Sequence, residues 1–462
     1  MSIPVHLFLV KVLNCLAEGC PVRLRNPASM CTFTFAFMIF LFGPPRTAAA
    51  ELTDTGIGEF RALIEEKKLA AHGKAGPLTN KETSMLRGFL DQFEDIKFGG
   101  YLDTYIQYES VNPDAGDSIA IPPLMFDRQV NSFTIKHIQL WLYKDAPEPG
   151  DIGFKISLDW GDMARRNTNN RPVYDDGLVA QPIGTAPVPG QTGGRQVTFS
   201  EAYVLWNIPL GKGLKAKFGK FPGWLGLEVW GSLWNPNYTA SYTNSWGTFG
   251  NATGLALGYD VTSRLSAHYY FTNTTGTFVN NNKSFTHGVE LNYILPDFAF
   301  FKSGWIHFGT IWGPEHALNN SQWTQRYDLT VSLSPFHKLT LVTDCNWVSD
   351  PIRTTQPSGR IKKDNHAWGV AQYFIYDYTA RLEFVARGEY YWDQENVLGI
   401  SGGDGASFAE VTGTVNIRLR ENILIRPEIR YDKILSVPGG SSHIWHHQDK
   451  NITALIGVSY EF

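Results

Sequence analysis

The last twelve residues, NITALIGVSYEF from Asn451 to Phe462, alternate between the two faces of an extended strand. One face is apolar and carries Ile452, Ala454, Ile456, Val458, Tyr460 and Phe462. The other face carries Asn451, Thr453, Gly457, Ser459 and Glu461, with Leu455 as its apolar exception. A period of two residues indicates a β-strand. An apolar face that ends on an aromatic C-terminus favours a strand facing lipid over an ordinary edge strand.

The composition narrows the class of protein. Of the 462 residues, 43% are hydrophobic, 14% aromatic and 18% charged. Beyond the N-terminal region no stretch is apolar for long enough to form a transmembrane helix, so a membrane protein with this sequence has to be a barrel. The aromatic residues suit interfacial girdles, or alternatively a large soluble β core. The net charge of −4 argues against a basic nucleic-acid-binding surface, and we expect no nucleic-acid partner.

The N-terminus has the order of an export signal. Arg23 and Arg25 precede an apolar run at 31–43, and three alanines that end at Ala50 follow. We expect a signal peptide over residues 1–50 with cleavage after Ala50, because a membrane anchor would need a longer run. Cys345 would then be the single cysteine of the mature chain, which excludes an internal disulfide.

Residues 51–95 are predicted to form a short helical extension in the periplasm. Thr79 and Glu82 make a capping-box pattern. An apolar stripe follows, made of Met85, Leu86, Phe89, Leu90 and Phe93. An oligomerisation helix and a plug are the alternatives to a helix packed near the barrel.

Residues 96–462 are predicted to form an all-β domain. We expect sixteen strands, near 97–109, 132–144, 151–160, 197–208, 214–221, 251–260, 264–274, 284–294, 300–311, 325–333, 338–348, 365–376, 378–392, 407–419, 422–433 and 451–462. Short turns, such as 295–298 and 420–422, alternate with long connections. Outer-membrane barrels have an even strand number, short periplasmic turns and long outer loops, whereas a sandwich does not sort its loops in this way. The pattern predicts a transmembrane antiparallel β-barrel with both ends in the periplasm.

Opposite faces of these strands differ in polarity. In 422–433, Ile423 and Ile429 share one face, while Arg426 and Glu428 share the other. Charges of both signs suit a wet lumen, although charged faces of a soluble sandwich would show the same periodicity. Sixteen strands would enclose an aqueous channel.

The alternation predicts a set of charged pore-lining residues. They are Glu201, Lys215, Lys217, Arg381, Glu383, Arg387, Glu389, Arg418, Arg426, Glu428 and Arg430. Because acids are interleaved with bases, we expect only a weak anion preference, set mainly by Lys217 and the arginines.

The connection at 222–250 is long and aromatic. It carries Trp224, Trp230, Trp234, Tyr238, Tyr242 and Trp246. So much apolar surface is expected to find cover, and folding into the barrel would cover it and narrow the pore. These rings could guide sugars, or they could simply pack the loop against the wall.

Five motifs carry a family resemblance. They are SEAYVLW at 200–206, LKAKFGKFPGWLGLEVW at 214–230, NPNY at 235–238, RGEYYWD at 387–393 and RPEIRYDK at 426–433. On these motifs the chain resembles the OmpL-like beta-barrel porin family, from about Phe98 to Phe462. The second motif matches the family pattern at Lys217, Gly219, Lys220, Phe221, Pro222, Leu225, Gly226 and Glu228. The resemblance implies an outer-membrane pore and does not imply one substrate.

No catalytic constellation stands out, and we expect no enzyme and no cofactor. His443, His446 and His447 could bind a transition metal, but no carboxylate is placed to support them, so we expect no metal site. We therefore expect a porin in the bacterial outer membrane that passes small hydrophilic solutes or ions by diffusion. Its outer surface would contact lipid, and it would act as a monomer or as a homo-oligomer. A channel selective for an oxyanion or saccharide and a non-conducting structural or adhesin barrel are the alternatives.

Overall fold

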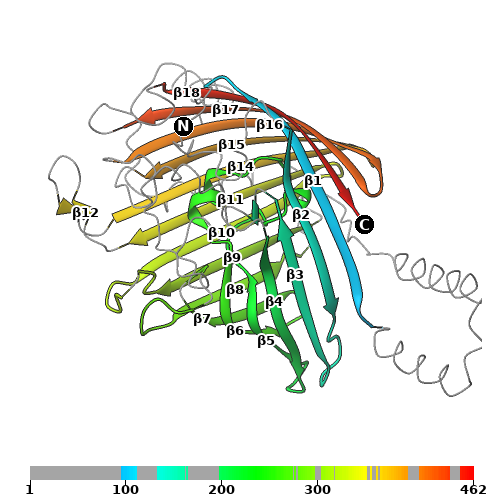
Figure 1. The fold of residues 1–462 in the computed structure, drawn as a ribbon, viewed down its shortest axis with the longest axis vertical. Coiled ribbons are helices and arrows are strands. Elements are labelled where there is room, and N and C mark those ends of the chain that lie inside the picture. Colours follow the sequence, from blue (N-terminus) through cyan, green and yellow to red (C-terminus); the bar gives the residue numbers. More distant parts are fainter. Residues whose placement is uncertain are drawn as a thin grey trace, which may run out of the picture.

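Sixteen antiparallel strands close into one barrel (Figure 1). The computed structural model describes residues 95–111, 133–161, 163–164, 197–273, 275–276, 279–296, 303–316, 318–350, 354–355, 361–362, 365–393, 405–437 and 448–462. The expected signal peptide and all but the last residue of the expected helical extension lie outside these residues.

The strands follow one another around the barrel in chain order. They are β1 (Lys97–Glu109), β2 (Phe133–Lys144), β3 (Ile152–Trp160), β4 (Val197–Ile208), β5 (Leu214–Pro222), β6 (Asn251–Asp260), β7 (Leu265–Thr272), β8 (Thr286–Ile294), β9 (Gly304–Gly313), β10 (Thr324–Phe336), β11 (Leu339–Asp350), β14 (Asn365–Thr379), β15 (Leu382–Asp393), β16 (Ala406–Arg420), β17 (Ile423–Ser436) and β18 (Lys450–Glu461). A separate hairpin, β12 (Thr354–Thr355) with β13 (Ile361–Lys362), lies in the connection after β11. The sixteen-stranded barrel predicted from the sequence is confirmed.

The last strand closes the barrel. β18 pairs with β1 in antiparallel register from Tyr101 opposite Glu461 to Glu109 opposite Thr453. Gly100 and Phe462 exchange both backbone hydrogen bonds, each 2.9 Å long. The start of β1 and the end of β18 therefore lie at the same rim of the barrel, which also carries the short turns.

Connection lengths alternate as expected among the described residues. The turn predicted at 295–298 lies partly outside them, and in the described part β8 ends at Ile294 and β9 begins at Gly304. Elsewhere the short-turn end has connections as tight as that between Arg420 and Ile423.

The faces of the barrel wall are sorted as the periodicity predicts. On β17, Ile429 is 60% exposed on the outer face, whereas Arg426 and Arg430 are fully buried on the inner face. A soluble barrel would bury its apolar face instead, so the outer surface is built to meet lipid.

Outward aromatic side chains gather toward both ends of the wall. Near the short turns they include Phe98, Trp206, Tyr293, Phe374, Tyr376, Phe384, Tyr460 and Phe462. Near the long connections they include Tyr108, Phe133, Phe285, Trp323, Tyr327 and Tyr431. Two such bands are typical of a barrel whose rims lie at the two membrane interfaces. No helix among the described residues has the length and apolar content needed to cross a membrane.

Candidate functional site: the inner loop and the lumen wall

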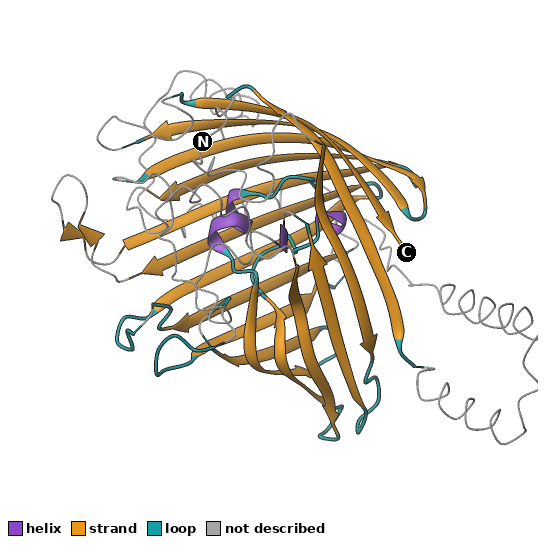
Figure 2. Cartoon of the chain, in the orientation of Figure 1, coloured by secondary structure: helices purple, strands orange, loops and turns teal. Residues whose placement is uncertain are grey.

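The connection between β5 and β6 lies inside the barrel. Its residues 223–250, called the inner loop below, contain two single-turn helices, η1 (Ser232–Trp234) and η2 (Thr243–Gly247). Figure 2 shows both helices within the ring of strands. The sequence-based expectation that this aromatic connection folds inward agrees with its position here.

The loop leaves β5 through an aromatic contact. The Trp224 ring stacks on Tyr270 of β7 with centroids 3.7 Å apart, and its Nε1 donates to the Thr310 carbonyl at 3.1 Å. The chain then turns at Gly226, whose φ of 84° is unfavourable for residues with a side chain. A Cβ at this position would also approach Thr248 Cγ2 to 2.8 Å. This glycine of the family motif is therefore needed for the turn.

A second aromatic cluster holds the far part of the loop. The Tyr242 and Trp246 rings stack with centroids 4.7 Å apart, and Tyr391 and Phe408 from the wall pack against them. The Tyr242 hydroxyl donates to Asp432 Oδ1 at 2.5 Å. Burial, reinforced by the Asp432 carboxylate, raises the pKa of Tyr242 well above its usual value. The phenol therefore stays protonated and keeps this hydrogen bond.

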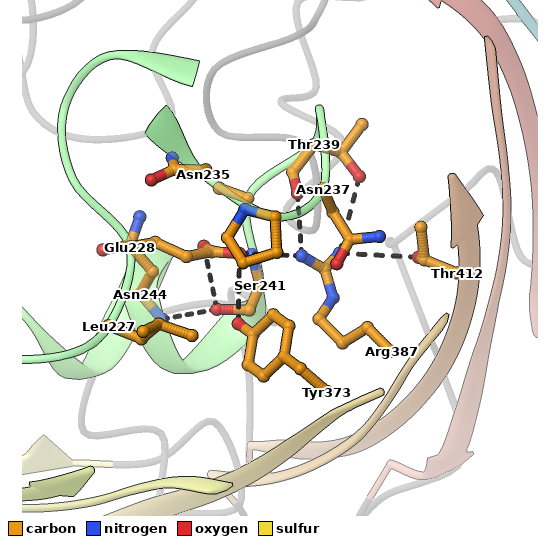
Figure 3. A network of polar contacts seen from close by, with 12 residues as sticks. Leu227, Glu228, Asn235, Asn237, Thr239, Ser241, Asn244, Tyr373, Arg387 and Thr412 are labelled. Atoms are coloured by element: carbon orange, nitrogen blue, oxygen red, sulfur yellow. Dashed lines mark hydrogen bonds and ion pairs between the residues drawn. The ribbon is translucent and has the colours of Figure 1, made fainter. Parts of the chain in front are cut away.

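Arg387 of β15 anchors the middle of the loop (Figure 3). Its Nη1 donates to Glu228 Oε1 and to the Thr239 carbonyl, both at 2.8 Å. Its Nε donates to Glu410 Oε1 of β16 at 2.6 Å. Glu228 in turn accepts from the Ser241 backbone N–H at 2.8 Å. One guanidinium thus ties two parts of the loop to the wall.

Other arginines bind backbone carbonyls of the loop. Arg426 donates to the carbonyls of Asn235 at 2.6 Å and Pro236 at 3.0 Å, and Arg430 donates to that of Ala240 at 2.6 Å. Arg326 of β10 donates to the Thr248 carbonyl at 2.7 Å and the Trp246 carbonyl at 3.0 Å. The planar fork of an arginine can satisfy several acceptors at once, which suits it to this role.

Carboxylates of the wall bind the backbone N–H groups of the loop. Glu389 accepts from Tyr242 at 2.6 Å and from Thr243 at 2.5 Å. Glu428 accepts from Tyr238 at 2.6 Å and from Thr239 at 3.0 Å. An irregular loop away from water needs such partners, because unpaired buried backbone groups are costly.

These contacts change the interpretation of part of the predicted lining. Arg387, Glu389, Arg426, Glu428 and Arg430 do project inward, but they are buried beneath the loop. Their charges bind protein groups, so they do not face passing solute. These arginines are therefore not placed to set the expected anion preference.

The other predicted lining residues lie elsewhere. Arg381 is exposed in the turn between β14 and β15. Lys215 is near the short-turn rim, where its Nζ lies 3.2 Å from Asp260 Oδ2. Glu383 and Arg418 line a cavity of about 350 Å³ below the loop.

The wall of β3 to β8 carries inward charges that keep some exposure. Lys155 pairs with Glu201 at 3.0 Å, and the Lys155 side chain is 33% exposed. Lys217 Nζ lies 5.3 Å from the centroid of the Tyr203 ring. His268 Nδ1 is 3.3 Å from Glu290 Oε2, with 29% of the His268 side chain exposed.

Two residues that bind the inner loop were missed in the sequence analysis. Asp344, which accepts from the Leu227 N–H at 3.1 Å, and Arg326 were not selected as lumen residues. The alternation of β10 and β11 places both side chains on the inner face, and this was the signal that the sequence offered. Their role follows only from the position of the inner loop. In the described residues no group of three or more His, Cys, Asp or Glu side chains is arranged to hold a metal ion, and the loop histidines His443, His446 and His447 lie outside those residues.

A closed sixteen-stranded barrel with an apolar exterior, two aromatic bands, a charged interior and an inward-folded loop defines a transmembrane channel of the porin class. A family model described as putative beta-barrel porin-2, OmpL-like, matches residues 95–462, and the chain belongs to this family. The protein is an outer-membrane porin that forms a passive diffusion channel.

Solved structures share the fold. The outer membrane channel DcaP of Acinetobacter baumannii is 10% identical, with a TM-score of 0.51 over 79% of this chain and 97% of that one. OprB of Pseudomonas putida is 11% identical, with a TM-score of 0.50 over 82% of this chain and 96% of that one. At such low identity the likeness concerns the fold alone. No curated protein sequence matches the chain.

Proposed function

We propose that solute crosses this porin between the inner loop and the wall of β3 to β8. The observation that carries the proposal is a contrast in exposure between two sides of the lumen. Arg387 and Arg430 have fully buried side chains under the loop, whereas Lys155 and His268 on the other side are 33% and 29% exposed. Water and small solutes can therefore reach Lys155 and His268, but not Arg387 and Arg430.

The charges along this route favour weak selectivity. Lys155 and Glu201 offset each other, and His268 lies beside Glu290. Lys217 rests against the Tyr203 ring and forms no ion pair with the described residues. We infer that Lys217 supplies a modest anion preference, since charges in a narrow pore act on partly dehydrated ions at short range.

A saccharide-guiding role for the loop aromatics has less support. Tyr238 and Tyr242 are 1% and 0% exposed, and Trp224 and Trp246 pack in the clusters described above. Rings used to fill space cannot also offer a face to a sugar. Among the tryptophans of the loop, Trp234 is the one that is 50% exposed.

We place the short-turn rim in the periplasm, together with both chain ends. An even number of strands brings β1 and β18 to that rim, and outer-membrane barrels keep their short turns there. The signal peptide over 1–50, the periplasmic extension over 51–95 and assembly into a homo-oligomer remain parts of this proposal.

Recordings in planar bilayers test the channel function. Purified protein should give stepwise conductance, and a salt gradient should give a small reversal potential of the sign for anions. Heat-unfolded protein from the same preparation is the control. A folded barrel that inserts into the bilayer but gives no conductance would support the non-conducting alternative and contradict this proposal.

A further inference from the structure

A cavity of about 350 Å³ lies between the inner loop and the short-turn ends of β14 to β17. Its lining is Leu233, Trp234, Asn235, Pro236, Ile375, Glu383, Asn416, Arg418 and Leu424. These wall residues come from different strands than the β3 to β8 route. The cavity is therefore separate from the groups to which we assign ion selectivity.

One part of the lining is apolar and centred on an aromatic ring. Trp234 is 50% exposed, unlike the buried tyrosines of the same loop. Tyr101 and Trp141 hold it from the wall, with ring centroids 5.1 Å and 6.0 Å away. Leu233, Ile375 and Leu424 extend this surface. An exposed ring that its neighbours hold in place is suited to pack against an apolar group of a ligand.

The other part of the lining carries two opposite charges with unused hydrogen-bonding capacity. Glu383 Oε1 accepts from Asn416 Nδ2 at 2.6 Å, and Oε2 accepts from none of the described residues. Among the described residues, the Arg418 guanidinium makes one long hydrogen bond, from Nη1 to the Glu421 carbonyl at 3.5 Å. The two side chains form no ion pair with each other. Arg426 nearby differs, because its guanidinium is filled by carbonyls of the loop.

We propose that this cavity binds a small zwitterion with an apolar side chain, of the kind that a free α-amino acid presents. Arg418 would bind the carboxylate, Glu383 the ammonium group, and Trp234 the side chain. Charge-assisted hydrogen bonds to arginine are strong and directional. The volume lies at the lower end of the roughly 300–1,000 Å³ typical of small-molecule pockets. A neutral sugar would offer no charged group to either side chain.

Calorimetric titration of the full-length protein in detergent micelles tests this assignment without reference to conductance. L-phenylalanine is the probe, and two analogues each lack one charge: 3-phenylpropanoate has no ammonium group and 2-phenylethylamine has no carboxylate. We expect each analogue to bind about tenfold more weakly than L-phenylalanine, the effect of losing one charge-assisted contact. Maltose serves as the neutral probe.

Variants assign the roles. Arg418→Gln should weaken L-phenylalanine about tenfold and leave 2-phenylethylamine unchanged, while Glu383→Gln should weaken L-phenylalanine and leave 3-phenylpropanoate unchanged. Trp234→Ala should weaken all three ligands. Lys215→Gln, at the same rim but on the opposite wall, is the matched control and should bind as the parent does.

Several results would overturn the proposal. They are the absence of binding by L-phenylalanine, binding of either analogue as tightly as L-phenylalanine, or binding of maltose more tightly than L-phenylalanine. The analogue series uses the unaltered protein, so it decides the matter even where a variant does not fold. Because calorimetry does not depend on ion flow, a barrel that binds the amino acid but does not conduct would refute the channel route alone.

Discussion

Arg387 of β15 and Glu228 of the inner loop form an ion pair in which Nη1 lies 2.8 Å from Oε1 and neither side chain is exposed. Both groups have further partners, since Arg387 also binds Glu410 and Glu228 accepts from Tyr373 at 3.1 Å. A pair without water around it is tolerated only when its remaining hydrogen-bonding positions are also filled. The loop is therefore fixed by a network and not by a surface contact.

Loss of the guanidinium should destabilise the protein strongly. Arg387→Met removes the guanidinium that binds the buried carboxylates of Glu228 and Glu410, and we expect the free energy of unfolding to fall by about 3–5 kcal/mol. Urea unfolding of the folded barrel in lipid vesicles measures this value. Arg381→Met, in the exposed turn, is the matched control and should change it by less than about 0.5 kcal/mol.

A double-mutant cycle separates the pair from general loss of packing. Glu228→Gln alone should be destabilising, but the combined Arg387→Met and Glu228→Gln change should cost less than the sum of the two. Additive effects would show that Arg387 acts on the loop through its carbonyl contacts and not through Glu228.

Selectivity should depend on the charge at Lys217. Lys217→Glu reverses the charge of a base on the β3 to β8 route that forms no ion pair with the described residues, so the reversal potential in a salt gradient should shift toward cations. Lys215→Glu is the control two residues away. Its position is 48% exposed near the rim, where solvent and salt screen a charge, so its shift should be smaller. Equal shifts would place the narrowest part of the route elsewhere.

Removal of the loop tip should widen the pore. Replacing residues 230–246 by a short Gly-Ser linker removes η1, most of η2 and the segment that spans the lumen, so single-channel conductance should rise. The arginines under the loop would become exposed at the same time, and the anion preference should increase. Unchanged conductance would mean that the loop does not limit the pore.

The barrel could be predicted because its signals are local. Strict alternation, as in Ile429 against Arg430, and the sorting of loop lengths follow from the period of a strand and from the two sides of a membrane. The inward fold of the aromatic loop was likewise predictable from Trp224 and Tyr242, whose apolar surface needs cover.

The roles of individual lumen charges could not be predicted in this way. Periodicity gives the face on which Arg387 or Lys217 lies, but it does not say what covers that face. The loop packs on β15 to β17 and leaves Lys155 of β3 partly exposed, which depends on contacts between residues far apart in the chain. The hydrogen bond from the Leu227 N–H to Asp344 also joins residues far apart in the chain, so periodicity could not predict it either.

Membrane topology can be tested with single cysteines. In a Cys345→Ser background, Asn422→Cys lies in the short turn between β16 and β17, and Ser321→Cys lies in the exposed connection between β9 and β10 at the opposite end. With the short turns in the periplasm, a membrane-impermeant maleimide should label Ser321→Cys on intact cells and Asn422→Cys only after lysis. Cys345 is removed because it is the single free cysteine of the described residues. The reverse labelling pattern would show that the barrel is inserted the other way, with both chain ends outside the cell.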